Sequence, residues 1–172
     1  PILTSGVDTN VETTPGRGTY GFQGSLTNIG IVGTGVDDIL AVIATGPDSG
    51  TYQLTSGGVP GPVVPFSGLT SLSFAGLDGT DLLTIQYPSN GQFIPIFYDG
   101  GTSPGDNDTL EIHGGSFDHI TKNFTDAHSG NIVLDPTGPG STSTITYTGL
   151  EPVLIDVGSV GNVEFNLPAG AY

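Results

Sequence analysis

Turn-forming residues divide this chain into short segments, and this feature limits its fold more than any other. Its 172 residues include 29 glycines and 13 prolines, and glycine or proline interrupts almost every ten-residue window. An amphipathic helix needs a longer run of good helix formers, with apolar side chains recurring about every 3.6 residues. No run in this sequence keeps that period, so the chain is not expected to be helical.

Between the turns, short runs alternate apolar side chains with polar ones. β-branched and aromatic residues with a period of two, bounded by glycine, proline, asparagine or aspartate, are typical of β-strands. The clearest runs are residues 39–43, 82–87, 93–98, 110–113, 131–134, 144–148 and 163–167. The sequence therefore predicts an all-β protein.

Three segments share one pattern: a strand, a corner rich in glycine and aspartate, and a second strand. They begin at Gly24, Ser67 and Thr148, and a looser fourth copy begins at Phe93. If the copies are structurally equivalent, their apolar residues occupy equivalent buried positions on stacked strands. The alignment predicts such equivalence for Leu26, Leu69 and Leu150, and for Ile31, Phe74 and Ile155.

This pattern favours a β-solenoid, in which each coil adds one strand to each face and equivalent strands stack in parallel. Residues 51–64 and 117–147 would leave the stack as excursions, the second with a hairpin around residues 126–130. The alternative is a β-sandwich or mixed β-sheet domain, which is also made of short alternating strands. The short link 88–92 favours that alternative, because it is typical of a hairpin.

A single all-β repeat domain is expected over residues 19–172, preceded by an N-terminal arm or linker over residues 1–18. The chain begins with Pro1 and contains no methionine, so we expect a processed product or a part of a longer protein. It contains no cysteine, which excludes disulfides and thiolate chemistry.

The charge balance limits the partners. Seventeen acidic residues against two basic ones, Arg17 and Lys122, give a net charge of −15. Nucleic acid is excluded as the main partner, because no basic surface exists to neutralise phosphates. No run of 18 apolar residues is present, so no membrane span is predicted. Scarce lysine and abundant threonine, serine, glycine and aspartate lead us to expect a secreted protein, extracellular or at the cell surface.

Two short motifs carry a resemblance to a known family. The segments Ile145-Thr-Tyr-Thr-Gly-Leu-Glu-Pro152 and Asn107-Asp-Thr-Leu-Glu-Ile112 resemble repeats of very large secreted bacterial surface proteins of the planctomycete type. Those repeats place tyrosine-threonine-glycine-leucine-glutamate before asparagine-aspartate-threonine-leucine. The resemblance covers roughly residues 20–168, with a degraded copy at residues 67–69 and 81–83. It implies a repetitive, non-catalytic surface or matrix protein and identifies no substrate.

Aspartates at the predicted corners are candidate metal ligands. Ca²⁺ takes six to eight hard oxygen ligands in a flexible arrangement. The segment Gly79-Thr-Asp-Leu-Leu83 partly matches the calcium-binding nonapeptide of β-rolls, although the tandem repetition of a true β-roll is missing. We therefore predict calcium as the cofactor, and the alternative is that aspartate and glycine serve only as turn formers. The candidate ligands are Asp78, Asp81, Asp106 and Asp108.

Catalysis is not predicted. His113, His119 and His128 lie within 16 residues, but a zinc site needs three or four ligands that converge. No hydrolase, metalloprotease or phosphate-binding motif is present. A glycosidase using two of the carboxylates stays open, because any two of them could converge. We predict a protein that is not an enzyme, with no catalytic residues and no organic cofactor.

These observations predict an extracellular structural protein: a self-associating subunit or repeat unit of a surface layer, an adhesin stalk or a filament. Its partners would be like subunits, forming a homo-oligomer or polymer. The alternative is a calcium-dependent or carbohydrate-binding adhesive module, with a polysaccharide as its partner.

Overall fold

The computed structural model describes residues 27–103, 105–150 and 153–168. These residues form strands and no helix, so the prediction of an all-β fold is confirmed. In this part of the chain there is accordingly no helix of the length and hydropathy needed to cross a membrane. The strands are β1 (Asn28–Val32), β2 (Asp38–Gly46), β3 (Ser49–Ser56), β4 (Val59–Pro60), β5 (Val64–Phe66), β6 (Ser71–Ala75), β7 (Leu82–Tyr87), β8 (Ile96–Asp99), β9 (Thr109–Phe124), β10 (Gly130–Pro136), β11 (Ser143–Thr148) and β12 (Val153–Asn166).

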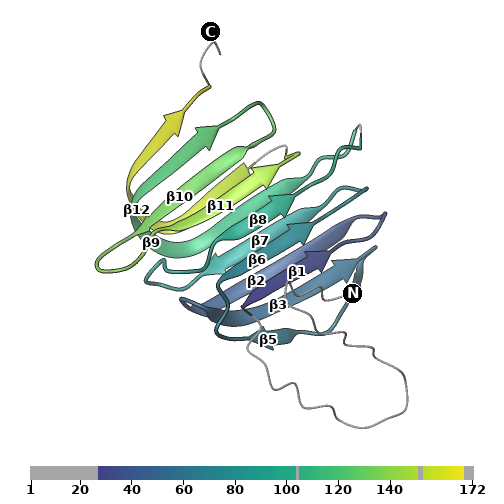
Figure 1. Ribbon diagram of the computed structural model, residues 1–172, viewed down its shortest axis with the longest axis horizontal. Helices are drawn as coiled ribbons and strands as arrows, with labels where there is room; N and C mark the ends of the chain where they lie inside the picture. The colour runs from purple at the N-terminus through teal and green to yellow at the C-terminus, as the bar shows by residue number, and fades with distance from the viewer. Residues whose placement is uncertain (1–26, 104, 151–152, 169–172) are drawn as a thin grey trace.

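All twelve strands belong to one curled sheet that contains both parallel and antiparallel pairs (Figure 1). Its order is β1-β6-β8-β11-β10-β9-β7-β2-β3-β4, while β12 pairs with β9 and β5 pairs with β3. In Figure 1, β12 lies at one end of the molecule and β3 and β5 lie at the other. The fold is thus compatible with the predicted alternative of a mixed β-sheet.

Eight of these strands form two parallel sets of four. The first set is β1, β6, β8 and β11, and the second is β2, β7, β9 and β12. The chain alternates between the sets, because each strand of the first set leads through a corner into the next strand of the second. Asn28 pairs with Ser71, Leu40 with Leu83 and Leu110 with Val153, each 43 residues further on. The other parallel steps are 24, 27 and 49 residues long.

The hydrophobic core is built from the inward-facing residues of both sets. Alternation along each strand turns every second side chain inward, as expected for a pleated strand. Phe74 of β6 and Tyr98 of β8 stack with their ring centroids 5.2 Å apart. Burying a large apolar side chain fully stabilises a fold by about 1.5–3 kcal/mol. The inward residues of the two sets are Ile29, Ile31, Leu72, Phe74, Ile96, Tyr98, Ile145 and Tyr147, and Leu40, Val42, Leu83, Ile85, Leu110 and Ile112.

Antiparallel strands extend the parallel sets at opposite ends. At one end β3 pairs with β2 and carries β4 and β5 on its other edge. At the other end β10 pairs with both β11 and β9. Strand β9 pairs with β7 through its first part and with β10 through its second part. It can do so because it bends at Gly114 and Gly115, which both have a φ of +69°. The predicted excursion 117–147 therefore contains the β9–β10 and β10–β11 pairs, including the expected hairpin, whereas most of β3 lies in the excursion 51–64 and its partner β2 lies outside it.

The third copy of the predicted repeat is misaligned. Ile155 does not lie in line with Ile31 and Phe74, because it pairs with Ile112 in the second set, and Tyr147 takes the predicted place. The corner of this copy follows Thr148, whereas the alignment placed it at residues 157–162, inside β12.

The link 88–92 is not a hairpin. Gly91 donates its N–H to the carbonyl of Pro88 in a tight turn, but β7 and β8 belong to different parallel sets and do not pair. Leu69 and Leu150 are buried, but they do not occupy the equivalent strand positions that the alignment predicts, because Leu69 precedes β6 and Leu150 follows β11. Leu26 and the boundary between residues 18 and 19 lie outside the described residues.

Candidate functional site

Three aspartates occupy equivalent places where the chain enters the second parallel set. Asp38, Asp81 and Asp108 each lie two residues before a fully buried leucine of β2, β7 or β9. Their side chains share the inward direction of those leucines, and the three residues are 0%, 0% and 4% exposed. We call these three residues the inner corner aspartates.

Two of the inner corner aspartates, Asp81 and Asp108, accept a backbone hydrogen bond from the neighbouring aspartate, and Asp38 accepts one from Thr34 of its own corner. The N–H of Asp38 donates to Oδ1 of Asp81 over 2.7 Å, and the N–H of Asp81 donates to Oδ1 of Asp108 over 2.8 Å. Hydrogen bonds to a carboxylate are roughly twice as strong as neutral ones. These hydrogen bonds therefore connect successive corners just before the strands β2, β7 and β9 pair with one another.

A row of glycines makes room for these carboxylates. A Cβ added to Gly33 would lie 2.6 Å from Oδ2 of Asp38, and one added to Gly100 would lie 2.8 Å from Oδ2 of Asp108. At Gly76 the added carbon would overlap Oδ2 of Asp81. These glycines end the first strand of each corner, and only a residue without a side chain fits there.

The buried carboxylates are incompletely satisfied. Oδ1 of Asp38 and Oδ2 of Asp81 are buried and have no hydrogen-bond partner among the described residues. The pKa of Asp81 is raised to about 6, mainly by burial; the hydrogen bond from the Asp38 N–H lowers it, and the nearby charges of Asp108, Asp38 and Asp37 oppose that lowering. A carboxyl group with this pKa changes its protonation state between pH 5 and pH 7.

Outer aspartates also bind the backbone of the neighbouring corner. Oδ1 of Asp37 accepts the N–H of Thr80 over 2.9 Å, and Oδ2 of Asp106 accepts the N–H of Gly79 over 3.0 Å. Asp78 accepts a hydrogen bond from the hydroxyl of Ser103. The carboxylates of these corners thus act as acceptors for protein N–H and O–H groups.

The four predicted calcium ligands fall into these two groups. Asp81 and Asp108 are inner corner aspartates, whereas Asp78 and Asp106 are more exposed and belong to the outer ones. Within the described ranges, no group of three or more histidine, cysteine, aspartate or glutamate side chains is arranged to hold a metal ion. Calcium binding by these residues stays a prediction.

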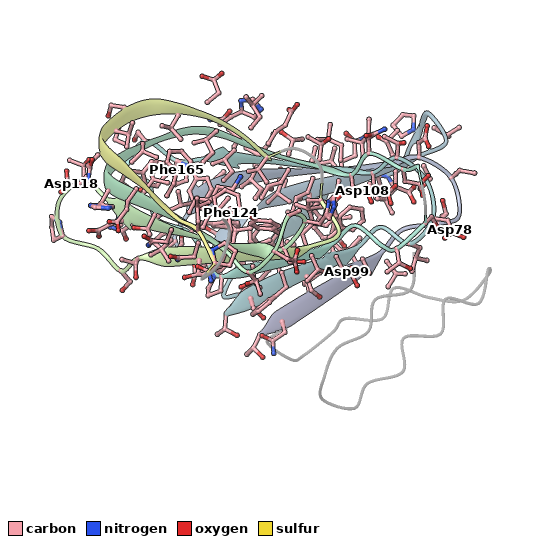
Figure 2. The ribbon with its side chains drawn as sticks, turned by 90° about the horizontal axis from the view of Figure 1, so that it is seen from above. Asp78, Asp99, Asp108, Asp118, Phe124 and Phe165 are labelled. Atoms are coloured by element: carbon pink, nitrogen blue, oxygen red, sulfur yellow. The ribbon has the colours of Figure 1, made fainter. Side chains whose placement is uncertain are left out.

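A polar hollow of about 460 Å³ opens beside the third corner, with Asp99, Asp106 and Asp108 in its wall. Thr148 of β11 also lines it, together with His128 and Ser129 of the turn between β9 and β10. Figure 2 shows Asp78, Asp99 and Asp108 in the same half of the molecule, and Asp118 at the opposite end. In this hollow the carboxylates of Asp99, Asp106 and Asp108 line a space that a ligand could enter.

The three histidines contact different acidic residues. His113 lies 3.1 Å from Oε2 of Glu111 and 3.7 Å from Oδ2 of Asp156. His119 lies 3.4 Å from Oε2 of Glu164. His128 donates its backbone N–H to Asp126 in the turn between β9 and β10. These contacts link β9 to β12 and order a turn, and they bring no two histidines together.

Sequence reasoning missed Asp38 and the glycine row, although a signal for both was present. In β2, β7 and β9 the order is aspartate, leucine two residues later, and valine or isoleucine two residues after that. Since the alternation turns the second and third of these residues inward, it turns the aspartate inward as well. Gly33 and Gly76 also precede their aspartates by the same five residues. A glycine five residues before such an aspartate is therefore the sequence signal for the contact between the two residues.

No family model, curated protein or solved structure matches the chain.

Proposed function

We propose that this protein is an extracellular structural protein, a self-associating subunit or repeat unit of a surface layer, stalk or filament. Its coils would form a β-solenoid, in which each coil supplies one strand to the first parallel set and one to the second. The observation that carries the proposal is the pair of parallel four-stranded sets, joined by corners that repeat the same glycine and aspartate contacts.

The hydrogen bonding of the two sets supports a mechanical role. Strand pairs run across the whole molecule, and the inner corner aspartates continue the bonding through the corners. In stacked repeat proteins each unit contacts mainly its neighbours, so stiffness comes from the sum of neighbouring interfaces. A chain of such coils resists bending without disulfides.

The surface is consistent with an exposed setting. Net charge far from zero keeps a protein soluble, and this chain reaches −15 through aspartate and glutamate rather than through mixed charges. Outward positions of the first set are mainly small or polar, such as Ser71 and Ser73 of β6 and Thr144 and Thr146 of β11.

The test is self-association of the purified chain. We expect sedimentation velocity to show species that grow with protein concentration, and negative-stain images to show particles elongated in one direction. A chain that stays monomeric up to millimolar concentration in salt would contradict the proposed self-association.

A calcium-dependent adhesive module is the second candidate, favoured by the polar hollow beside Asp99, Asp106 and Asp108. Bound Ca²⁺ would raise the stability of the folded state by about 2.7 kcal/mol at a hundredfold excess over Kd. Mg²⁺ at equal ionic strength would do less, because it demands a tighter octahedral shell.

Melting curves in chelator, Ca²⁺ and Mg²⁺ test this candidate. The Asp106→Asn variant should lose the calcium-specific shift, whereas Asp118→Asn, at the opposite end of the molecule, should keep it. Equal curves in the two ions would leave the corner aspartates as acceptors for the backbone alone.

A further inference from the structure

Strand β12 ends the second parallel set with a long free edge. It pairs with β9 from Val153 to Asn166 in one constant register, and among the described residues nothing pairs with its other edge. Natural proteins protect such edges with charged side chains, proline, bulges or a covering segment. The 14 residues of β12 contain no proline and no lysine, and their two charged side chains, Asp156 and Glu164, flank an uncharged stretch from Val157 to Val163, where the edge is open to another strand.

The side chains of β12 are also unusually apolar for an exposed strand. Phe165 is 62% exposed, Leu154 49%, and Val160 and Val163 39% each. From Val157 to Val163 the strand carries no charged side chain. Val160 and Val163 pair with the core residues Phe117 and Ile120 and therefore share one face of the sheet, and contiguous exposed apolar side chains of this kind mark an interaction site.

The opposite end of the molecule carries a groove of matching character. This groove has a volume of about 270 Å³ and lies between β1 and the strands β3 and β4. No charged residue lines it, and its apolar wall includes Ile31, Tyr52, Leu54 and Val59. Strand β1 borders the groove and pairs, within the described part of the chain, only with β6.

The charge pattern identifies the occupant of both surfaces. Two copies of a chain with a net charge of −15 repel each other wherever their acidic faces meet. The groove and the middle of β12 are free of charge, so contact between two copies is least costly there. The two surfaces also complement each other, since one is an apolar strand with a free edge and the other is an apolar groove beside a free edge.

We propose that β12 of one copy docks into the groove at the β1 end of the next copy, with Phe165 as the anchoring side chain. This inference rests on the proposed self-association and names its interface. The two surfaces lie at opposite ends of one chain, so the contact is head to tail and leaves a free β12 and a free groove on every assembly. The expected product is an open linear chain.

Single charges at the two surfaces test the interface. Phe165→Glu places a charge on β12, and Val59→Glu places one in the groove, where Val59 is 71% exposed. Because both side chains are exposed, both variants should fold and melt like the wild type. Each should weaken association by at least about tenfold, as truncating an interface hot spot does.

Matched controls carry the same charge at exposed side chains that lie neither on β12 nor in the lining of the groove. Phe97→Glu alters an exposed aromatic residue of β8, and Ile43→Glu alters an exposed aliphatic residue of β2. Both controls should associate like the wild type. Equal weakening in the controls would mean that added charge alone opposes assembly, and the interface would be wrong.

Mixing the two end variants separates head-to-tail contact from every other arrangement. Phe165→Glu keeps an intact groove and Val59→Glu keeps an intact β12, so an equimolar mixture should form dimers that do not grow. No dimer in the mixture would overturn the head-to-tail contact, and a wild type that never associates would overturn the proposed self-association instead. A Val59→Glu variant that melts lower and associates normally would show that the chain's own residues fill the groove.

Discussion

At the scale of single residues, the carboxyl group of Asp81 lies in an environment that disfavours its charged form. Its carboxyl group is fully buried, one oxygen has no partner among the described residues, and its pKa is raised to about 6. A carboxyl group with a raised folded-state pKa favours its protonated form in the fold. Its contribution to stability is therefore complete below its ordinary pKa of 3.8 and is lost as the pH rises through about 6.

The Asp81→Asn variant tests this pH dependence. Asparagine keeps an oxygen that can accept the N–H of Asp38, and it carries no charge at any pH. We expect the wild type to melt at a higher temperature at pH 5 than at pH 7.5, and the variant to lose most of that difference. Asp78→Asn, which removes a more exposed carboxylate from the same corner, is the control and should keep the difference. An unchanged slope in Asp81→Asn would assign the pH dependence to other carboxylates.

The glycine row gives a second prediction at this scale. Gly76→Ala places a carbon against Oδ2 of Asp81, and we expect it to lower the free energy of unfolding by about 1–3 kcal/mol, as overpacking does. Gly35→Ala lies in the first corner with no atom within 4 Å of the added carbon, and it should cost far less. Urea unfolding of both variants measures the difference. Equal costs would mean that backbone freedom, not space for the carboxylate, selects glycine at position 76.

At the scale of elements, β9 connects the two halves of the sheet. Its first part pairs with β7 and its second part with β10, while β12 follows both parts along the other edge. The bend at Gly114 and Gly115 lets this one strand pair first with β7 and then with β10. A residue other than glycine reaches such a φ at a cost of roughly 1–2 kcal/mol.

Gly115→Ala tests the bend. The added carbon would have the strained φ and would also lie 2.6 Å from the buried ring of Phe117. Gly105→Ala shares a positive φ but meets no atom within 4 Å, so it measures the backbone cost alone. We expect Gly115→Ala to exceed this control by about 1–3 kcal/mol in unfolding free energy. Similar values for the two variants would show that the ring of Phe117 moves aside freely.

The sequence predicted the strands of this sheet better than their partners. Alternation locates a strand within a few residues, because it depends only on which side chains face the core. Pairing depends on where the chain turns, and two turns misled the prediction. The sequence of the corner after Thr148 resembles the start of a repeat, and the link 88–92 resembles a hairpin although it joins two different sets.

The same limit applies to the candidate site. Composition and spacing indicate Asp81 and Asp108 as candidates, but as metal ligands at a surface corner. Their inward direction follows from the alternation of the strands that they precede, and the sequence gives no direct sign of the hydrogen bonds between neighbouring corners. Those bonds join residues 43 and 27 positions apart, so only the register of the fold brings them together.

At the scale of the whole molecule, the net charge of −15 opposes any contact between copies. We expect salt to promote self-association, because screening shortens the range of this repulsion to about 8–10 Å at physiological ionic strength. Lowering the pH toward the isoelectric point of about 4.1 should act in the same direction. Light scattering across a salt series and a pH series measures both effects. Association that weakens with added salt would show that ion pairs, not apolar contacts, hold the copies together.

The position of the antiparallel strands also determines which strand pairs form first during folding. Every parallel pair joins residues 24 to 49 positions apart, whereas the β2–β3 hairpin begins at Gly46 and Ser49, and the β9–β10 hairpin at Phe124 and Gly130. Local hairpins form within microseconds, and distant pairings form later because the chain must first close long loops. One hairpin lies at the β2 end of the second set and the other beside β9. We therefore expect the two hairpins to be ordered first, the strands between them to add next, and β12 to join outside the β9–β10 hairpin.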